Sequence, residues 1–129
     1  MAGVVIGIAN TSEDLIELLR LACERAGWTT AAIHIPDVKA GRVSFEEFLR
    51  VHEPAGLIID IAPPYEENWR FVAQLRKLPA MRARAVVITT TNVRHLTQLS
   101  GEETGAIEIV GKPNDIEAVV DAMRRALAK

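Results

Sequence analysis

The chain has 129 residues and a net charge of -2, a length that predicts one globular domain over residues 1–129. Its apolar content of 49% and charged content of 25% are those of an ordinary folded protein, so a disordered chain is excluded. The weak negative charge argues against nucleic acid or an anionic membrane surface as the main partner.

Short apolar segments rich in β-branched residues predict five strands, at residues 4–9, 29–35, 57–61, 86–88 and 107–110. Capping side chains at residues 10–14 open a helix that ends before Gly27. The polar residues 36–43 are expected to form a loop. Ser44 and Glu47 have capping-box spacing and begin a short helix that ends near Pro54, because proline lacks the amide that a helix interior needs.

The second half of the chain repeats the same alternation. A helix that carries Trp69 stops at Pro79, a short helix contains Leu96, and Asn114 and Glu117 have capping-box spacing at the start of the last helix. Five strands that alternate with five helices predict an α/β fold, a five-stranded parallel sheet with helices on both faces. Functional groups in such sheets lie at the carboxyl ends of the strands.

The single cysteine and the apolar segments bear on the compartment. Cys23 has no partner for an internal disulfide, and its apolar neighbours at helical spacing predict a buried thiol. Residues 3–9 form the longest apolar run, far short of the roughly 20 residues that span a bilayer. The N-terminus also lacks the features of a signal peptide. We therefore expect a cytoplasmic protein with no membrane partner.

Polar side chains gather at the predicted strand ends. They are Asn10 and Thr11 after the first strand, Asp60 in the third, Thr90 after the fourth, and Lys112 and Pro113 after the fifth. A carboxylate inside an apolar strand is costly to bury without a partner or a function, and Lys112 is the natural partner of Asp60. A carboxylate, a hydroxyl and an ammonium group in one crevice are the groups that an aspartyl phosphate needs.

Residues 54–64, with Asp60 and Pro64, resemble the third-strand segment of the receiver domains of bacterial response regulators, of the flavodoxin-like chemotaxis-receiver type. Thr90 and the Lys112-Pro113 step follow at the separations usual in that family, so the resemblance covers almost the whole (βα)5 chain. It implies that Asp60 is the phosphoacceptor and that Thr90 and Lys112 contact the phosphoryl group. It also implies a signalling module, not an enzyme, with at most self-catalysed phosphotransfer to Asp60.

The chain departs from the family at the metal site. Receivers carry an acidic pair after the first strand, and the positions of that pair are Asn10 and Thr11 here. Mg²⁺ prefers carboxylate oxygens, so we expect the degenerate site of Asn10, Thr11 and Asp60 to bind Mg²⁺ weakly, and we expect no other cofactor. Glu13 and Asp14 lie nearby in the predicted first helical turn, where complementing the helix dipole is their ordinary role.

Two further positions differ from the family pattern. Thr91 replaces a very small residue and is expected to narrow access to Asp60, and Ile109 replaces an aromatic residue that takes part in switching. The resemblance implies a histidine kinase, a phosphotransfer protein or an output protein as partner. It also places a homodimer or partner surface on the face that residues 93–99 and 107–123 form.

These observations predict an atypical receiver domain of two-component or phosphorelay signalling. It acts through protein recognition, and phosphorylation of Asp60 is weak, partner-dependent or absent. Two alternatives stay open at this point. One is a fully competent phosphoacceptor with an unorthodox metal site, and the other is a small flavodoxin-like anion-binding protein, which is disfavoured because the chain has no phosphate-binding glycine loop.

Overall fold

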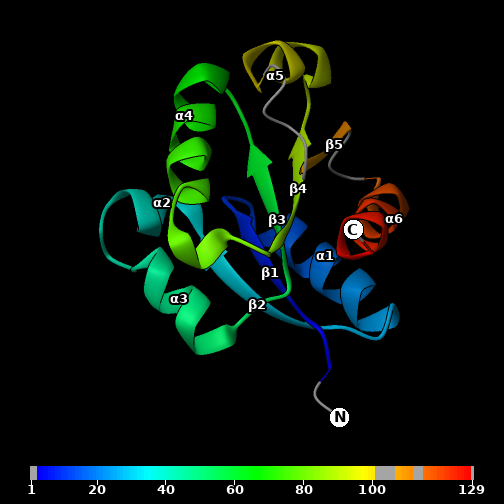
Figure 1. The fold of residues 1–129 in the computed structure, drawn as a ribbon. Coiled ribbons are helices and arrows are strands. Elements are labelled where there is room, and N and C mark those ends of the chain that lie inside the picture. Colours follow the sequence, from blue (N-terminus) through cyan, green and yellow to red (C-terminus); the bar gives the residue numbers. More distant parts are fainter. Residues whose placement is uncertain (1–2, 101–106, 112–114, 129) are drawn as a thin grey trace.

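A computed structural model describes residues 3–100, 107–111 and 115–128. Its sheet contains five strands, β1 (Val5–Asn10), β2 (Thr29–His34), β3 (Gly56–Ile61), β4 (Ala85–Thr90) and β5 (Ile107–Gly111). All neighbouring strands are parallel, and their order is β2-β1-β3-β4-β5 (Figure 1). The predicted parallel sheet is therefore confirmed, with strand boundaries that differ by at most two residues from the sequence-based ones.

The helices are α1 (Glu13–Arg25), α2 (Ile35–Lys39), α3 (Phe45–His52), α4 (Tyr65–Arg76), α5 (Val93–Ser100) and α6 (Ile116–Leu127), with a 3-10 turn, η1 (Pro79–Met81). Two of the predicted starts are confirmed by their capping bonds. Ser12 Oγ accepts from Leu15 N at 3.3 Å, and Ser44 Oγ accepts from Glu47 N at 3.2 Å. None of the helices in the described part of the chain is long and apolar enough to cross a membrane.

Two predictions about helices were wrong. Residues 36–43 are not all loop, because α2 occupies Ile35–Lys39; Pro36 stands in its first turn, where a missing amide costs nothing and the fixed backbone angle favours the helix. The connection between β2 and β3 therefore holds two helices. The N-cap of α6 is Asp115 and not Asn114, since Asp115 Oδ1 accepts from Ala118 N at 3.3 Å; Asn114 itself lies outside the described residues.

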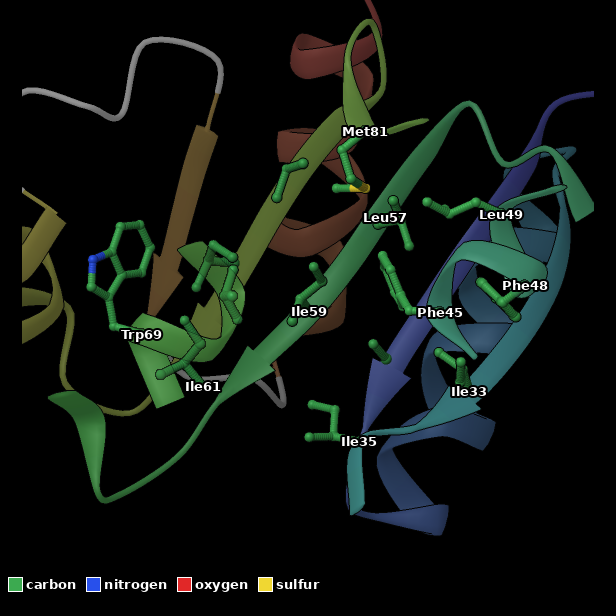
Figure 2. Close-up of a cluster of buried hydrophobic side chains, with 14 of the residues drawn as sticks. Ile33, Ile35, Phe45, Phe48, Leu49, Leu57, Ile59, Ile61, Trp69 and Met81 are labelled. Atoms are coloured by element: carbon green, nitrogen blue, oxygen red, sulfur yellow. The ribbon is translucent and has the colours of Figure 1, made fainter. Parts of the chain in front are cut away.

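Helices cover both faces of the sheet (Figure 1). A separate apolar cluster lies between the sheet and the helices on each face. On one face, side chains of β3 pack against α3, α4 and α5. Figure 2 shows Leu57, Ile59 and Ile61 along β3, with Phe48 and Trp69 from the helices. On the other face α1 and α6 pack together over Ile6, Ile8, Ile58 and Val87. The buried thiol predicted for Cys23 is confirmed in this second cluster, where the side chain is fully buried.

The strand order determines where a site can form. The chain runs outward from β1 to β2 on one side and from β3 through β4 to β5 on the other, so the direction of winding reverses between β1 and β3. A parallel sheet of this order has a crevice at the carboxyl ends of the two strands that flank the reversal. Asn10 ends β1 and Asp60 is the penultimate residue of β3, so both predicted site residues lie beside this point.

Candidate functional site at the carboxyl end of the sheet

Asp60 is half-buried near the end of a strand whose other residues are fully buried. Its carboxylate is hydrogen-bonded from the neighbouring strand, where Thr89 Oγ1 donates to Asp60 Oδ1 at 2.7 Å. Burial raises the pKa of Asp60 because water solvates the charged form better than the protein does, and the Thr89 hydrogen bond lowers it by a smaller amount. The net pKa is raised, which is typical of a carboxylate at a functional site.

The hydroxyl that donates to Asp60 belongs to Thr89, a residue that the sequence analysis did not single out. Thr89 lies directly beside Asp60 in the β3–β4 register, whereas Thr90 lies beside Ile61. Adjacent residues of a strand point to opposite faces, so Thr89 shares the face of Asp60 and Thr90 does not. Thr90 is fully buried, and its Oγ1 accepts from Asn92 N at 3.3 Å. The sequence-based analysis missed Thr89, and only the strand register identifies it.

The side chain of Asn10, at the end of β1, accepts hydrogen bonds from backbone amides. It is 1% exposed, and its Oδ1 accepts hydrogen bonds from Thr11 N at 2.7 Å and Ser12 N at 3.0 Å. An amide oxygen has two lone pairs, so these two bonds use its accepting capacity. The side chain therefore fixes the turn that leads from β1 into α1.

A small cavity adjoins Asp60. Its volume is about 40 Å³ and it is lined by Thr11, Ile35, Lys39, Asp60, Ala62, Asn68, Phe71 and Val72. A group the size of a water molecule needs roughly 15 Å³, so the cavity admits small polar groups. Thr11 and Lys39 are exposed, which makes the cavity reachable from solvent. The described lining thus contains one carboxylate and one ammonium group.

Solved structures with a similar fold include receiver domains and other response-regulator proteins. A sensor protein from Polaromonas sp. JS666 superposes with a TM-score of 0.77 at 20% identity, covering 97% of this chain and 96% of that chain. The chemotaxis protein CheY4 of Vibrio cholerae gives a TM-score of 0.74 at 17% identity, over 97% of this chain and 99% of that one. The chain has the receiver-domain fold. This confirms the predicted fold class and the resemblance to receiver domains.

Sequence comparison points the same way as the receiver-domain fold. Response regulator Rre1 of Synechocystis sp. is 27% identical over 93 residues, which are 72% of this chain and 40% of that protein. The match therefore spans less than half the length of this curated relative. No protein-family model matches the chain. The chain is accordingly similar to a response regulator in sequence and to receiver domains in structure.

Few of the described residues around Asp60 offer the oxygen ligands that Mg²⁺ prefers. Mg²⁺ is octahedral and takes oxygen ligands, usually including one or two carboxylates. Asp60 supplies the only carboxylate in the described cavity lining, and one of its oxygens already accepts from Thr89. The Asn10 oxygen is engaged by two backbone amides. An ammonium group, from Lys39, lines the same cavity and would repel a divalent cation.

Neither acid of the first turn of α1 lines this cavity. Glu13 is turned toward β2, where its Oε1 lies 2.9 Å from His34 Nε2, and both Glu13 and Asp14 are exposed. The described residues include no group of three or more His, Cys, Asp or Glu side chains that is arranged to hold a metal. The acids expected to complement the helix dipole are thus in a position to do so.

Three of the other predicted positions lie among the described residues. Pro64 is the N-cap of α4 and forms a cis peptide bond with Pro63. Thr91 is exposed and its Oγ1 lies 2.8 Å from Tyr65 Oη, so it links the start of α4 to the loop before α5 and is absent from the described cavity lining. Ile109 is partly buried against the cluster around β3. Lys112 and Pro113 lie outside the described residues, and their roles stay predictions.

Proposed function

We propose that this chain is an atypical receiver domain of two-component or phosphorelay signalling that works by binding proteins. Phosphorylation of Asp60 is then weak, partner-dependent or absent. The observation that carries this proposal is that two backbone amides occupy the Asn10 oxygen, while Asp60 is the one carboxylate in the described lining of the cavity. Phosphoryl transfer depends on cations that neutralise the developing charge, and a donor set of this kind has little affinity for Mg²⁺.

The partners we propose are a histidine kinase, a phosphotransfer protein or an output protein. The similarity to a response regulator and to receiver-domain structures supports this class of partner. We further propose that the face comprising α5, β5 and α6 binds them or a second copy of the chain. Its exposed Val93 supports an apolar contact there.

Intact-protein mass spectrometry after incubation with acetyl phosphate tests the chemistry. In the transfer, a carboxylate oxygen of Asp60 bonds to phosphorus and acetate leaves, so the chain gains one phosphoryl group. We expect little adduct on the wild type and no increase when millimolar Mg²⁺ is added. The Asn10→Asp/Thr11→Asp double variant, which restores the acidic pair, should gain an Mg²⁺-dependent adduct. The matched control is the same double variant with Asp60→Asn, which should gain none.

A rapid adduct on the wild type that needs Mg²⁺ and disappears in Asp60→Asn would contradict the proposal and support the competent phosphoacceptor. The biological test is complementation of a strain from which the gene for this protein has been deleted. We expect Asp60→Ala, once shown to fold by circular dichroism, to restore the signalling phenotype as well as the wild type does. Loss of signalling in this folded variant would refute the recognition role without phosphorylation.

A further inference from the structure

Lys39 is a residue to which the sequence assigned no role, and the fold brings it to Asp60. It is the last residue of α2, the short helix that replaces part of the expected loop after β2. Its side chain lines the cavity that Asp60 also lines, although the two residues lie 21 positions apart and on different sides of the winding reversal. The segment between β2 and β3 therefore places the Lys39 ammonium group at the site.

Two contacts from α4 hold the Lys39 side chain in place. Its Nζ donates a hydrogen bond to Asn68 Oδ1, and it lies 5.3 Å from the centroid of the Phe71 ring. Asn68 is itself oriented, because its Nδ2 donates to Ala62 O at 2.7 Å in the loop just after β3. The cation is thus tied to the segment that immediately follows Asp60.

The Lys39 ammonium group has N–H donors left over to bind a ligand. An ammonium has three N–H donors, and the bond to Asn68 uses one of them. The remaining cavity lining is largely apolar, from Ile35, Phe71 and Val72, and an apolar wall strengthens the attraction between a cation and an anion. Lys39 forms no ion pair with Asp60 within 4 Å among the described contacts, and both residues line the cavity of about 40 Å³.

We propose that Lys39 is the built-in cation of the Asp60 site, so that the site binds a small anionic mimic of a phosphoryl group without a divalent metal, although transfer of a phosphoryl group to Asp60 stays weak. This inference rests on the proposed receiver function and specifies the chemistry of its site. Asn10, Thr11 and Asp60 together offer too few carboxylates to bind Mg²⁺ well. The Lys39 ammonium group supplies the positive charge that Mg²⁺ would otherwise provide. Asp60 provides the oxygen to which the group is attached.

Beryllofluoride, which coordinates a carboxylate oxygen as a phosphoryl group would, is the direct probe. Its binding to the full chain is followed by ¹⁹F NMR in EDTA and again in millimolar Mg²⁺. We expect a bound signal in EDTA that Mg²⁺ changes little and that is absent in Asp60→Asn. Lys39→Met keeps the aliphatic stem against Phe71 but removes the charge, and should weaken binding by about tenfold or more, as expected for losing a hydrogen bond to a charged group.

Lys77→Met is the matched control, because Lys77 is exposed at the end of α4 and does not line the cavity. It should bind beryllofluoride as the wild type does. Circular dichroism and urea unfolding of Lys39→Met exclude misfolding, and Lys39→Arg should recover part of the binding by restoring the charge.

Three results would overturn the inference: binding that requires Mg²⁺, equal binding by Lys39→Met and the wild type, or no bound signal in either buffer. None of these decides whether the domain signals without phosphorylation, which the Asp60→Ala complementation tests separately. Conversely, loss of signalling in Asp60→Ala would refute that function while leaving metal-free binding at Lys39 intact.

Discussion

At the scale of single residues, the chemistry of the site depends on which hydroxyl group and which cation lie near Asp60. The register of β3 and β4 places Thr89 at the carboxylate, and α2 places Lys39 at the same cavity. Family spacing pointed to Thr90 and Lys112. Thr90 Oγ1 accepts a hydrogen bond from Asn92 N, and Lys112 lies outside the described residues. Thr89 and Lys39 are therefore neighbours of Asp60 or its cavity that the sequence pattern did not identify, and the roles of Thr90 and Lys112 toward a phosphoryl group stay predictions.

Replacing Thr89 by valine removes the hydroxyl that donates to Asp60 and keeps the side-chain shape. We expect the pKa of Asp60 to rise further and the free energy of unfolding at neutral pH to fall by about 1–3 kcal/mol, because the charged carboxylate loses a donor. Carbonyl ¹³C NMR titration and urea unfolding measure the two effects. Thr90→Val is the matched control and should leave the pKa of Asp60 unchanged; a larger pKa change in Thr90→Val would contradict the assignment.

The raised pKa of Asp60 also predicts how stability depends on pH. The folded state binds the proton more tightly than the unfolded state, so the free energy of unfolding contributed by this group falls as the pH rises from the unfolded pKa through the folded one. Asp60→Asn removes the charge and keeps an acceptor for Thr89. We expect its melting temperature at neutral pH to exceed that of the wild type by about 3 °C.

Calorimetry of both proteins across the acid range measures this effect. The difference between the wild type and Asp60→Asn should shrink as the pH drops below the folded pKa of Asp60, where the wild-type carboxyl is also neutral. A wild type that is more stable than Asp60→Asn at neutral pH would show that the Asp60 charge is stabilised in the fold.

At the scale of elements, the connection from β1 to α1 is built by Asn10. Its amide oxygen accepts from two successive backbone amides, and Ser12 then caps the helix through Leu15 N. The same residue was expected from the sequence as a poor metal ligand. The structure gives it a different function, because it satisfies amides that would otherwise lack partners at a helix start.

Asn10→Ala should therefore destabilise the fold even in EDTA. We expect the free energy of unfolding to fall by about 2 kcal/mol, since two partly buried amides lose their acceptor. Asn92→Ala is the matched control, because exposed Asn92 accepts from one amide, His95 N at 3.1 Å, and its loss should cost about 1 kcal/mol. Urea unfolding of both variants checks the order; equal costs would argue against the double role of the Asn10 oxygen.

At the scale of the whole molecule, one sheet separates two apolar clusters. Leu49 of α3 and Met123 of α6 are fully buried on opposite faces. Because both clusters include residues of β3, loss of packing on either face weakens the same central strand. The protein should accordingly unfold as one cooperative unit.

Leu49→Ala and Met123→Ala should each lower the free energy of unfolding by about 2–5 kcal/mol. Circular dichroism and tryptophan fluorescence should report the same urea midpoint in each variant. The two tryptophans make this test specific, since Trp69 is buried in one cluster and Trp28 packs against the other. A fluorescence transition that separates from the dichroism transition in either variant would contradict a single cooperative unit.

The sequence by itself determined the alternation of strands and helices, the parallel sheet and the position of Asp60 at its carboxyl end, because hydrophobic periodicity and capping residues are local signals. Only the tertiary structure decided which groups meet Asp60. Strand register places Thr89 beside Asp60, and contacts with Asn68 and Phe71 of α4 hold the Lys39 side chain at the cavity that Asp60 lines. These are contacts between segments far apart in the chain, and side-chain patterns within each segment carry no information about them.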